Sequence, residues 1–173
     1  MLKKSRCFGN GEGKEFYADY HDNEWGIPVY DDNKLFEMIT LEGAQAGLSW
    51  ETILKKRQGY RDAFYNFDIN KVSKMPDNAL EKLRDNKNIV RNKLEIYSVR
   101  TNAIAFLNIQ KEHKSFSKYL WKFVSNQPIV NHWQRSEQVP TTTTTSDLIS
   151  KDLKHNGMKF IGSTIIYAYM QAV

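Results

Sequence analysis

Apolar positions recur along most of this chain with the three- to four-residue spacing of an amphipathic helix. The first such segment, residues 35–41, is an apolar helical stripe that Gly43 and Gly47 then interrupt. Ser49 is placed to cap the next helix, which we expect to run to about Arg57. Long alternating strands are absent, so the pattern predicts an all-α fold.

A short helix, a polar turn and a longer helix are predicted in the middle of the chain. Pro76-Asp77 opens the short helix. The turn Asn86-Lys87-Asn88 separates it from a longer helix with apolar positions from Ile89 to Leu107. We therefore expect a helical hairpin over about residues 77–108.

The remaining third of the chain carries three further helical patterns. One covers residues 116–124, and the last runs from about Ser163 to the end. Between them, Thr144 and Asp147 have the spacing of a capping box, and Gly157 is placed to end that helix.

Length and composition favour a single domain over residues 1–173. The chain has 173 residues, and 40% of them are hydrophobic, which is enough to bury one core. Nothing repeats. The only low-complexity run is the threonine segment 141–145, which we interpret as a loop entering a helix because β-branched residues favour extended backbone.

Cysteine usage and the apolar runs limit the class of protein. Cys7 is the only cysteine, so no internal disulfide can form, which fits a reducing cytoplasm. No apolar run approaches the roughly 20 residues that span a bilayer, and the basic start lacks the apolar segment of a secretory signal. We expect a soluble, cytoplasmic protein with no membrane partner, and nothing suggests more than a monomer.

Positive charge is concentrated in the predicted hairpin. The chain has a net charge of +5, and six cations face two acids between Lys82 and Arg100. Backbone N–H groups in a tight turn can hold a phosphate oxygen with help from cations such as Lys87, Arg91 and Lys93. Asn88 takes the place that glycine commonly has in such a turn, and Asn tolerates the left-handed conformation. The alternative is an ordinary helical hairpin with a solvated basic face.

A pocket for a flat ring is suggested by the segment from Tyr20 to Trp50. Trp50, Tyr20, Tyr17 and Trp25 could wall a site that stacks an extruded base. Glu42 is a carboxylate inside an apolar run, and it could accept hydrogen bonds from an exocyclic amine or offset the charge of a cationic base. The alternatives are core aromatics and a Glu42 that pairs with a nearby Lys or Arg.

Leu48 lies in a Gly-Leu-Ser turn between two predicted helices. An apolar side chain exposed at such a corner could wedge into a base stack and fill the gap left by a flipped nucleotide. The alternative is that Leu48 packs inward.

Spaced blocks over nearly the whole chain resemble one known family. They are HDNEWG, LFEMITLEGAQAGLSW, NIVRNKLEI, YLWKFV and SDLISKDLKHNGMKFIGSTIIYAYMQA. Together they look like the DNA-3-methyladenine glycosylase I family, which implies an all-α helix-hairpin-helix glycosylase that acts on double-stranded DNA containing alkylated adenine.

The resemblance also implies a role for each candidate residue. Glu42 and Tyr20 would hydrogen-bond the base, and Trp50 would stack on it. Tyr17 and Trp25 would shape the pocket, Leu48 would be the wedge, and Lys87, Asn88 and Arg91 would contact the phosphates. The implied enzyme is monofunctional: it hydrolyses the bond between 3-methyladenine and deoxyribose and leaves an abasic site.

A small zinc module joining the chain ends is a further implication of the resemblance. In the family two Cys and two His hold the metal, and the first pair matches Cys7 and His21. The second pair lies beyond the position of Val173, so the module is incomplete in this sequence, and two ligands alone do not close a structural zinc site. The family's tryptophan soon after the first cysteine is also replaced, and Phe8 is expected to take over its packing.

Two rivals stay open from the sequence. One is a non-catalytic helix-hairpin-helix module that binds DNA through the basic hairpin alone, which would leave Tyr20, Glu42 and Trp50 unexplained. The other is a glycosylase for a different alkylated purine.

Overall fold

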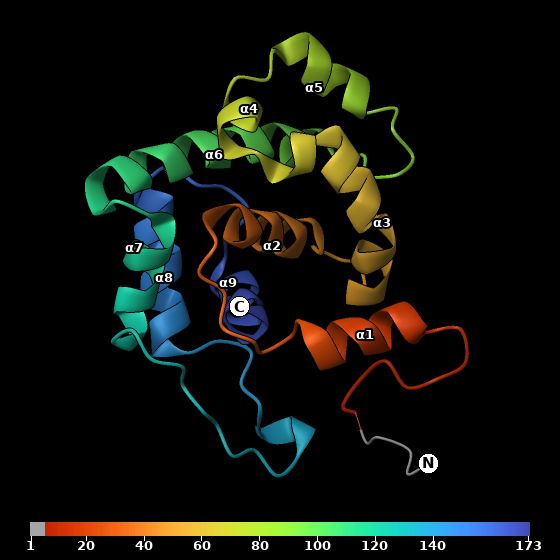
Figure 1. Ribbon diagram of the computed structural model, residues 1–173, viewed down its shortest axis with the longest axis vertical. Coiled ribbons are helices and arrows are strands. Elements are labelled where there is room, and N and C mark those ends of the chain that lie inside the picture. Colours follow the sequence, from red (N-terminus) through yellow and green to blue (C-terminus); the bar gives the residue numbers. More distant parts are fainter. Residues whose placement is uncertain (1–5) are drawn as a thin grey trace.

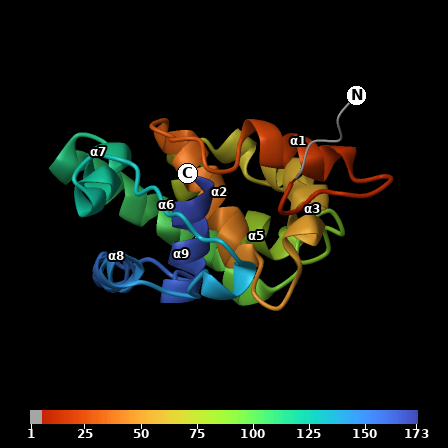
Figure 2. The ribbon, with the colours of Figure 1, turned by 90° about the horizontal axis from the view of Figure 1, so that it is seen from below.

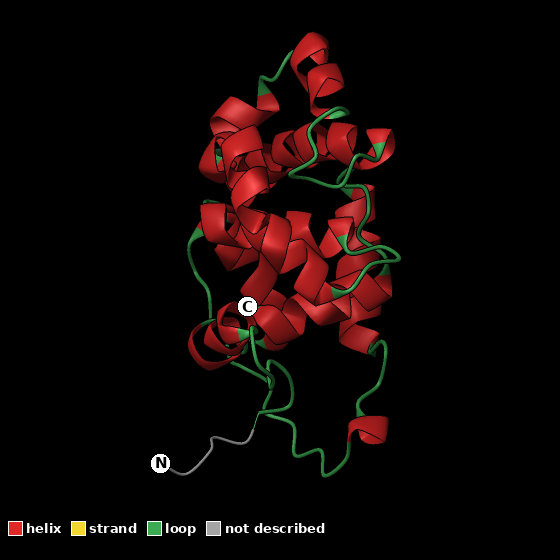
Figure 3. Ribbon diagram, turned by 90° about the vertical axis from the view of Figure 1, so that its right-hand side faces the viewer, coloured by secondary structure: helices red, strands yellow, loops and turns green. Residues whose placement is uncertain are grey.

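A computed structural model of the chain describes residues 6–173, and this part of the chain is helical with no strand (Figure 3). The all-α prediction is therefore confirmed. The α-helices are α1 (Glu15–Asn23), α2 (Asp32–Ala44), α3 (Trp50–Ala63), α4 (Ile69–Ser73), α5 (Asp77–Leu83), α6 (Lys93–His113), α7 (Phe116–Trp121), α8 (Thr144–His155) and α9 (Ser163–Ala172). Short 3-10 turns cover Tyr65–Phe67, Lys122–Val124 and Ser136–Gln138.

Helix α2 is the centre of the molecule. It packs against α3, α6, α7 and α9, which surround it in Figure 1. Every residue from Leu35 to Ala44 is buried, as expected of a helix covered on all sides. Close packing favours glycine at position 43, because a Cβ there would lie 3.1 Å from the carbonyl oxygen of Phe160. The buried apolar side chains form one continuous cluster around this helix.

Several predicted helix ends agree with the structure. Ser49 caps α3 by accepting a hydrogen bond from the Thr52 N–H, and Pro76 precedes α5. Gly157 has a φ of +88° just beyond α8, in the left-handed region that suits glycine after a helix. Helix α3 continues past Arg57 to Ala63, because Tyr60 and Phe64 extend its buried face into the core.

Two predicted starts are wrong by a few residues. Helix α6 begins at Lys93 rather than near Ile89, because the Asn92 side chain caps it by accepting from two backbone N–H groups. The capping box of α8 uses Thr143 and Ser146, not Thr144 and Asp147. The Ser146 side chain is buried, so it stays on the inner side of the turn, whereas Asp147 accepts a hydrogen bond from Ser163. Helices α1 and α4 were not predicted.

Helix α1 lies beside the start of α3 (Figures 1 and 2). It makes few close backbone contacts with any other helix. Side chains hold it instead, among them a 2.8 Å hydrogen bond from Lys14 to Glu51 on α3. In residues 6–173 no helix combines the length and apolar composition needed to cross a membrane.

Candidate active site

Glu42 lies in the last turn of α2 with a side chain that is almost completely buried. The residue is 4% exposed, and it makes no hydrogen bond or ion pair with any of residues 6–173. The alternative of a Lys or Arg partner is therefore wrong for the described structure. Burial without a counter-charge raises the pKa of this carboxyl to about 8. Such a group is unusual unless it serves a site.

Tyr20 and Trp50 place two more unpartnered polar groups beside this carboxyl. Tyr20 is on α1 and Trp50 begins α3, and their ring centroids are 5.6 Å apart. Neither the Tyr20 hydroxyl nor the Trp50 indole N–H has a hydrogen-bond partner in the described part of the chain, and both atoms are buried. Burial first, and then the nearby charge of Glu42, raise the pKa of Tyr20. Three helices therefore bring together a carboxyl, a hydroxyl and an indole N–H that lack partners.

Tyr17, Trp25 and Phe8 form an aromatic group next to Tyr20. Phe8 stacks on Tyr17 with centroids 4.8 Å apart and meets Trp25 edge-on at 5.1 Å. Phe8 also lies 6.2 Å from the Tyr20 ring. Phe8 thus packs between the side chains predicted to shape the pocket, where a residue soon after Cys7 was expected. Phe8 therefore belongs to this aromatic group, and the sequence signal for it was its distance from Cys7.

Leu48 stands at an exposed corner between α2 and α3. The Leu48 N–H donates to the Gln45 carbonyl, and Gly47 has a φ of +76°, so a tight turn projects the side chain outward. Leu48 is 40% exposed, which excludes inward packing.

The predicted DNA-binding residues lie on the loop between α5 and α6. Lys87, Asn88 and Arg91 are all exposed, and no carboxylate of the described residues pairs with Lys87 or Arg91. Lys93 is not free in this way, because its ammonium group forms an ion pair with Glu81 at 3.0 Å. The free cations of this loop are therefore Lys87 and Arg91.

Asn88 does not adopt the left-handed conformation that the glycine comparison suggested. Its N–H donates to the Asn86 side chain at 2.9 Å, which closes the turn without positive φ. The backbone of Asn88 lies very close to α3, and a glycine on α3 makes room for it. A Cβ on Gly59 would lie 2.3 Å from the Asn88 carbonyl oxygen. The glycine that this turn needs is in α3 and not in the turn itself.

Cys7 and His21, the predicted metal ligands, are brought together. The Cys7 Sγ and His21 Nε2 atoms are 3.1 Å apart, and His21 Nδ1 lies 3.1 Å from Asp22. Two ligands of one tetrahedral zinc ion would be about 3.5 Å apart, so the pair fits half of such a site. A carboxylate on the second imidazole nitrogen is the usual support of a zinc-bound histidine. No group of three potential ligands occurs among residues 6–173.

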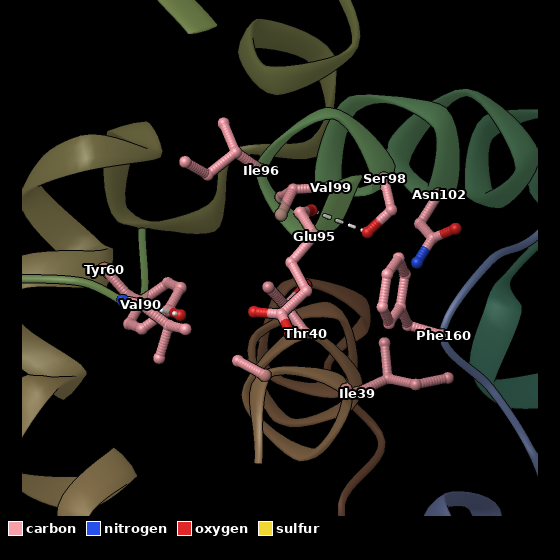
Figure 4. Close-up of a pocket in the computed structure, with 12 residues that line it drawn as sticks. Ile39, Thr40, Tyr60, Val90, Glu95, Ile96, Ser98, Val99, Asn102 and Phe160 are labelled. Atoms are coloured by element: carbon pink, nitrogen blue, oxygen red, sulfur yellow. Dashed lines mark hydrogen bonds between the residues drawn. The ribbon is translucent and has the colours of Figure 1, made fainter. Parts of the chain in front are cut away.

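A second buried carboxyl, which sequence reasoning missed, lies on another side of α2. Glu95, in the first turn of α6, points toward Thr40 of α2 in a small cavity that Tyr60 also lines (Figure 4). Burial raises the pKa of Glu95 to about 7. Thr40 and Glu42 are two positions apart on one helix and so face roughly opposite directions, which separates this cavity from the Glu42 site.

Comparisons with known proteins point to one family. The family described as methyladenine glycosylase matches residues 10–173. The chain is 47% identical to DNA-3-methyladenine glycosylase 1 of Escherichia coli K12 over 156 residues, 90% of this chain and 83% of that protein. It is 45% identical to a DNA-3-methyladenine glycosylase of Haemophilus influenzae over 169 residues, 98% of this chain and 91% of that protein.

Solved structures agree over nearly the whole fold. A crystal structure of 3-methyladenine DNA glycosylase I superposes with a TM-score of 0.92 at 43% identity, covering 97% of this chain and 92% of that one. A variant of 3-methyladenine DNA glycosylase I in complex with 3-methyladenine also gives 0.92, at 36% identity, covering 96% and 88%.

Residues 6–173 form an all-helical fold in which unpartnered polar groups lie beside a group of aromatic side chains, an arrangement typical of enzymes that take a base out of the DNA stack. The chain belongs to the DNA-3-methyladenine glycosylase I family, and it is an enzyme that hydrolyses N-glycosyl bonds.

Proposed function

We propose that this enzyme is a monofunctional glycosylase that excises 3-methyladenine from double-stranded DNA and leaves an abasic site. The observation that carries the proposal is the group of Glu42, Tyr20 and Trp50. The buried Tyr20 hydroxyl and Trp50 indole N–H have no partner within residues 6–173, and the Glu42 side chain, on a residue that is 4% exposed, makes no hydrogen bond or ion pair within the same residues. An extruded base with polar edges would supply those partners. A relative crystallised with 3-methyladenine gives the substrate class.

Each member of the pocket has a proposed task. Glu42 accepts a hydrogen bond from the exocyclic amine, and Tyr20 bonds the edge of the base. Trp50 stacks on the ring, and Tyr17 and Trp25 shape the walls. Electron-rich indole and phenol faces attract a cationic ring, and alkylation at N3 makes the adenine in DNA cationic.

Cleavage of this glycosidic bond requires little acid catalysis. The base carries a positive charge before cleavage, so it leaves as neutral 3-methyladenine when the glycosidic electron pair moves onto it. Water then adds to the oxocarbenium-like sugar and loses a proton. The pocket contributes by holding the base and by placing negative charge near the reaction, so positioning and electrostatics carry the rate.

DNA is held at two proposed places outside the pocket. Leu48 enters the gap that the flipped nucleotide leaves. Lys87, Asn88 and Arg91 contact the phosphates in the manner of a helix-hairpin-helix element, which positions the enzyme without reading sequence. The enzyme is proposed to act as a monomer in the cytoplasm.

Zinc binding by Cys7 and His21 is also proposed. When bound, zinc would fasten the start of the chain to α1, on which His21 lies. The 3.1 Å separation of the two ligands supports this, and two further ligands would be needed to close the site.

The test is to incubate the protein with methylated DNA and identify the released free bases by mass spectrometry. We expect 3-methyladenine to be released while 7-methylguanine stays in place, and Glu42→Gln to release less while remaining folded. Release of several alkylpurines would indicate a broader pocket. Binding of DNA without any release by folded protein would favour the non-catalytic module.

A further inference from the structure

Helix α1 and the two residues after it carry three of the five proposed pocket residues, and this helix is poorly anchored by its backbone. Tyr17 and Tyr20 lie on α1, and Trp25 is the second residue beyond its end. Helix α1 makes few close backbone contacts with its neighbours, whereas Glu42 lies on the well-packed α2. Alignment of the two halves of the pocket therefore depends on side-chain contacts between α1 and the core.

Arg57 makes the most extensive of these contacts. It lies on α3 and is 8% exposed. Its Nη1 and Nη2 atoms donate to the two carboxylate oxygens of Glu24, the C-cap residue directly after α1, at 2.9 and 2.8 Å. Its Nε atom donates to Glu37 on α2 at 2.8 Å. One guanidinium group therefore ties the end of α1 to both α2 and α3.

The ion cluster around Arg57 contains three cations and two carboxylates. Glu24 and Glu37 face Arg57, while Lys34 lies 2.7 Å from Glu24 and Arg61 lies 2.7 Å from Glu37. Burial alone would raise the pKa of Glu24, but hydrogen bonds from Arg57 and Lys34 lower it to about 2. Hydrogen bonds from Arg57 and Arg61 likewise lower the pKa of Glu37 despite its burial, so both carboxylates are ionised at neutral pH.

We propose that Arg57 is a positioning residue, which locks α1 in the register that brings Tyr20 and Trp25 to Glu42 and Trp50. Arg57 acts through Glu24 and needs no contact with the base. This inference rests on the proposed function, because the pocket it aligns is the proposed base pocket.

The test compares Arg57→Lys and Arg57→Met with a matched control, Arg61→Met. Arg61 lies one turn along the same helix and pairs with Glu37 but not with Glu24. Two quantities are measured below the unfolding temperature: hydrogen exchange of the α1 amides, and affinity for free 3-methyladenine followed by tryptophan fluorescence. Wild type is measured first, and if it neither binds nor excises 3-methyladenine, the proposed function fails whatever Arg57 does.

We expect Arg57→Met to speed exchange across residues 15–23 and to weaken 3-methyladenine binding at least tenfold. Arg57→Lys keeps the charge but loses the two-pronged contact, so it should show an intermediate loss and provide a folded variant if Arg57→Met does not fold. Arg61→Met should leave both readings near wild type. Unchanged exchange and affinity in a folded Arg57→Lys variant would overturn the proposal, as would equal losses in Arg61→Met.

The cavity between α2 and α6 carries a second, independent inference. Its volume is about 10 Å³, which is room for one water molecule. Two polar atoms in it, Glu95 Oε2 and Thr40 Oγ1, are buried without a partner in the described part of the chain, and their residues are 8% and 6% exposed. The Tyr60 hydroxyl at its edge accepts from the Val90 N–H, so its own proton is available to donate.

We infer that one ordered water molecule occupies this cavity and bridges Glu95 to Thr40, with Tyr60 as a third partner. It would link α2, α3 and α6 next to the end of the α5–α6 loop, where a dry cavity would leave both orphaned oxygens unsatisfied.

The test is a crystal structure at a resolution that shows other buried waters, together with crystals soaked in rubidium ions. We expect a peak within hydrogen-bond distance of both Glu95 Oε2 and Thr40 Oγ1, with no anomalous signal, and its loss in Thr40→Val but not in Thr40→Ser. An empty cavity in wild type, or a rubidium peak that marks a cation, would overturn the inference.

Discussion

At the scale of single residues, the site is defined by polar groups that the fold leaves without partners. Glu42, Tyr20 and Trp50 each carry such a group, as judged from residues 6–173, and desolvation is the cause of the raised pKa of Glu42. Leaving a buried polar group unsatisfied costs about 1–3 kcal/mol. These residues therefore lower stability in the free enzyme and gain partners when a base enters.

Glu42 should give activity a pH dependence with a known sign. The carboxylate is the form proposed to hold the base, and the folded free enzyme holds the proton up to a pH of about 8. We expect kcat/KM to rise with pH through about 8, since kcat/KM reports ionisation of the free enzyme. Steady-state excision assays from pH 6 to 9 test this. The rise should be absent in Glu42→Gln, and a flat wild-type profile would contradict the assignment.

Tyr20→Phe should separate binding from stability. The Tyr20 hydroxyl has no partner among the described residues, so removing it should leave the free energy of unfolding unchanged or raise it by up to about 1 kcal/mol. Excision should fall about tenfold, because a hydrogen bond to the base is lost. Urea unfolding and single-turnover excision measure the two effects. A loss of stability without a loss of excision would make Tyr20 a core residue only.

At the scale of elements, the loop between α5 and α6 combines free cations with a tight backbone approach to α3. Lys87 and Arg91 are exposed, while Lys93 is paired with Glu81. Gly59 lets the Asn88 carbonyl approach α3, and Lys56 donates to the Lys87 carbonyl at 2.7 Å. The loop therefore contacts α3 through its backbone, while the side chains of Lys87 and Arg91 remain exposed to solvent.

Lys87→Ala with Arg91→Ala should flatten the salt dependence of DNA binding. Each phosphate contact contributes about 0.9 to the slope of log K against log salt concentration, so losing two should reduce the slope by about 2. Titrations of double-stranded DNA at several salt concentrations measure it. Lys154→Ala, an exposed cation on α8, is the control. An unchanged slope in the double variant would remove this loop from the interface.

Gly59→Ala should test the contact between the loop and α3. The added Cβ would fall 2.3 Å from the Asn88 carbonyl oxygen, so the loop must move or the fold must weaken by about 1–3 kcal/mol. Gly162→Ala meets no atom within 4 Å and should cost less than about 1 kcal/mol. Thermal unfolding and DNA affinity of both variants check this. Wild-type values in Gly59→Ala would show that the close approach is unimportant.

At the scale of the whole molecule, a buried central helix with an uncompensated carboxyl makes stability depend on pH. Below about pH 4.5 Glu42 is protonated in both the folded and the unfolded chain. Between about 4.5 and 8 the unfolded chain ionises first, so stability falls as pH rises through this window and then levels off. Glu95, with a pKa of about 7, acts in the same direction.

Glu42→Gln should therefore be more stable than wild type at high pH and nearly equal to it at low pH. We expect a gain of about 2–4 kcal/mol at pH 9 and little difference at pH 5, since a pKa shift of one unit corresponds to about 1.4 kcal/mol. Urea unfolding at the two pH values measures it. Equal stability at pH 9 would mean that Glu42 is ionised and compensated in the folded protein.

Apolar periodicity predicted most of the helices and the buried stripe of α2 from the sequence alone, since local spacing dictates which face is buried. It missed α1 and α4, and the central position of α2 is known only from the structure. Ser49 and Gly157 marked helix ends because capping is local chemistry. Glu42 was conspicuous for the same reason, as a carboxylate within an apolar run.

Only the tertiary structure decided which groups find partners, because partners come from distant parts of the chain. Glu42 has none among the residues that the structure describes, whereas Arg57 meets Glu24 across 33 positions of sequence. The glycine required by the α5–α6 turn proved to be Gly59, on another helix. Burial and pairing are properties of the packed molecule, so the pKa of Glu42 and the anchoring of α1 could not be predicted from local pattern.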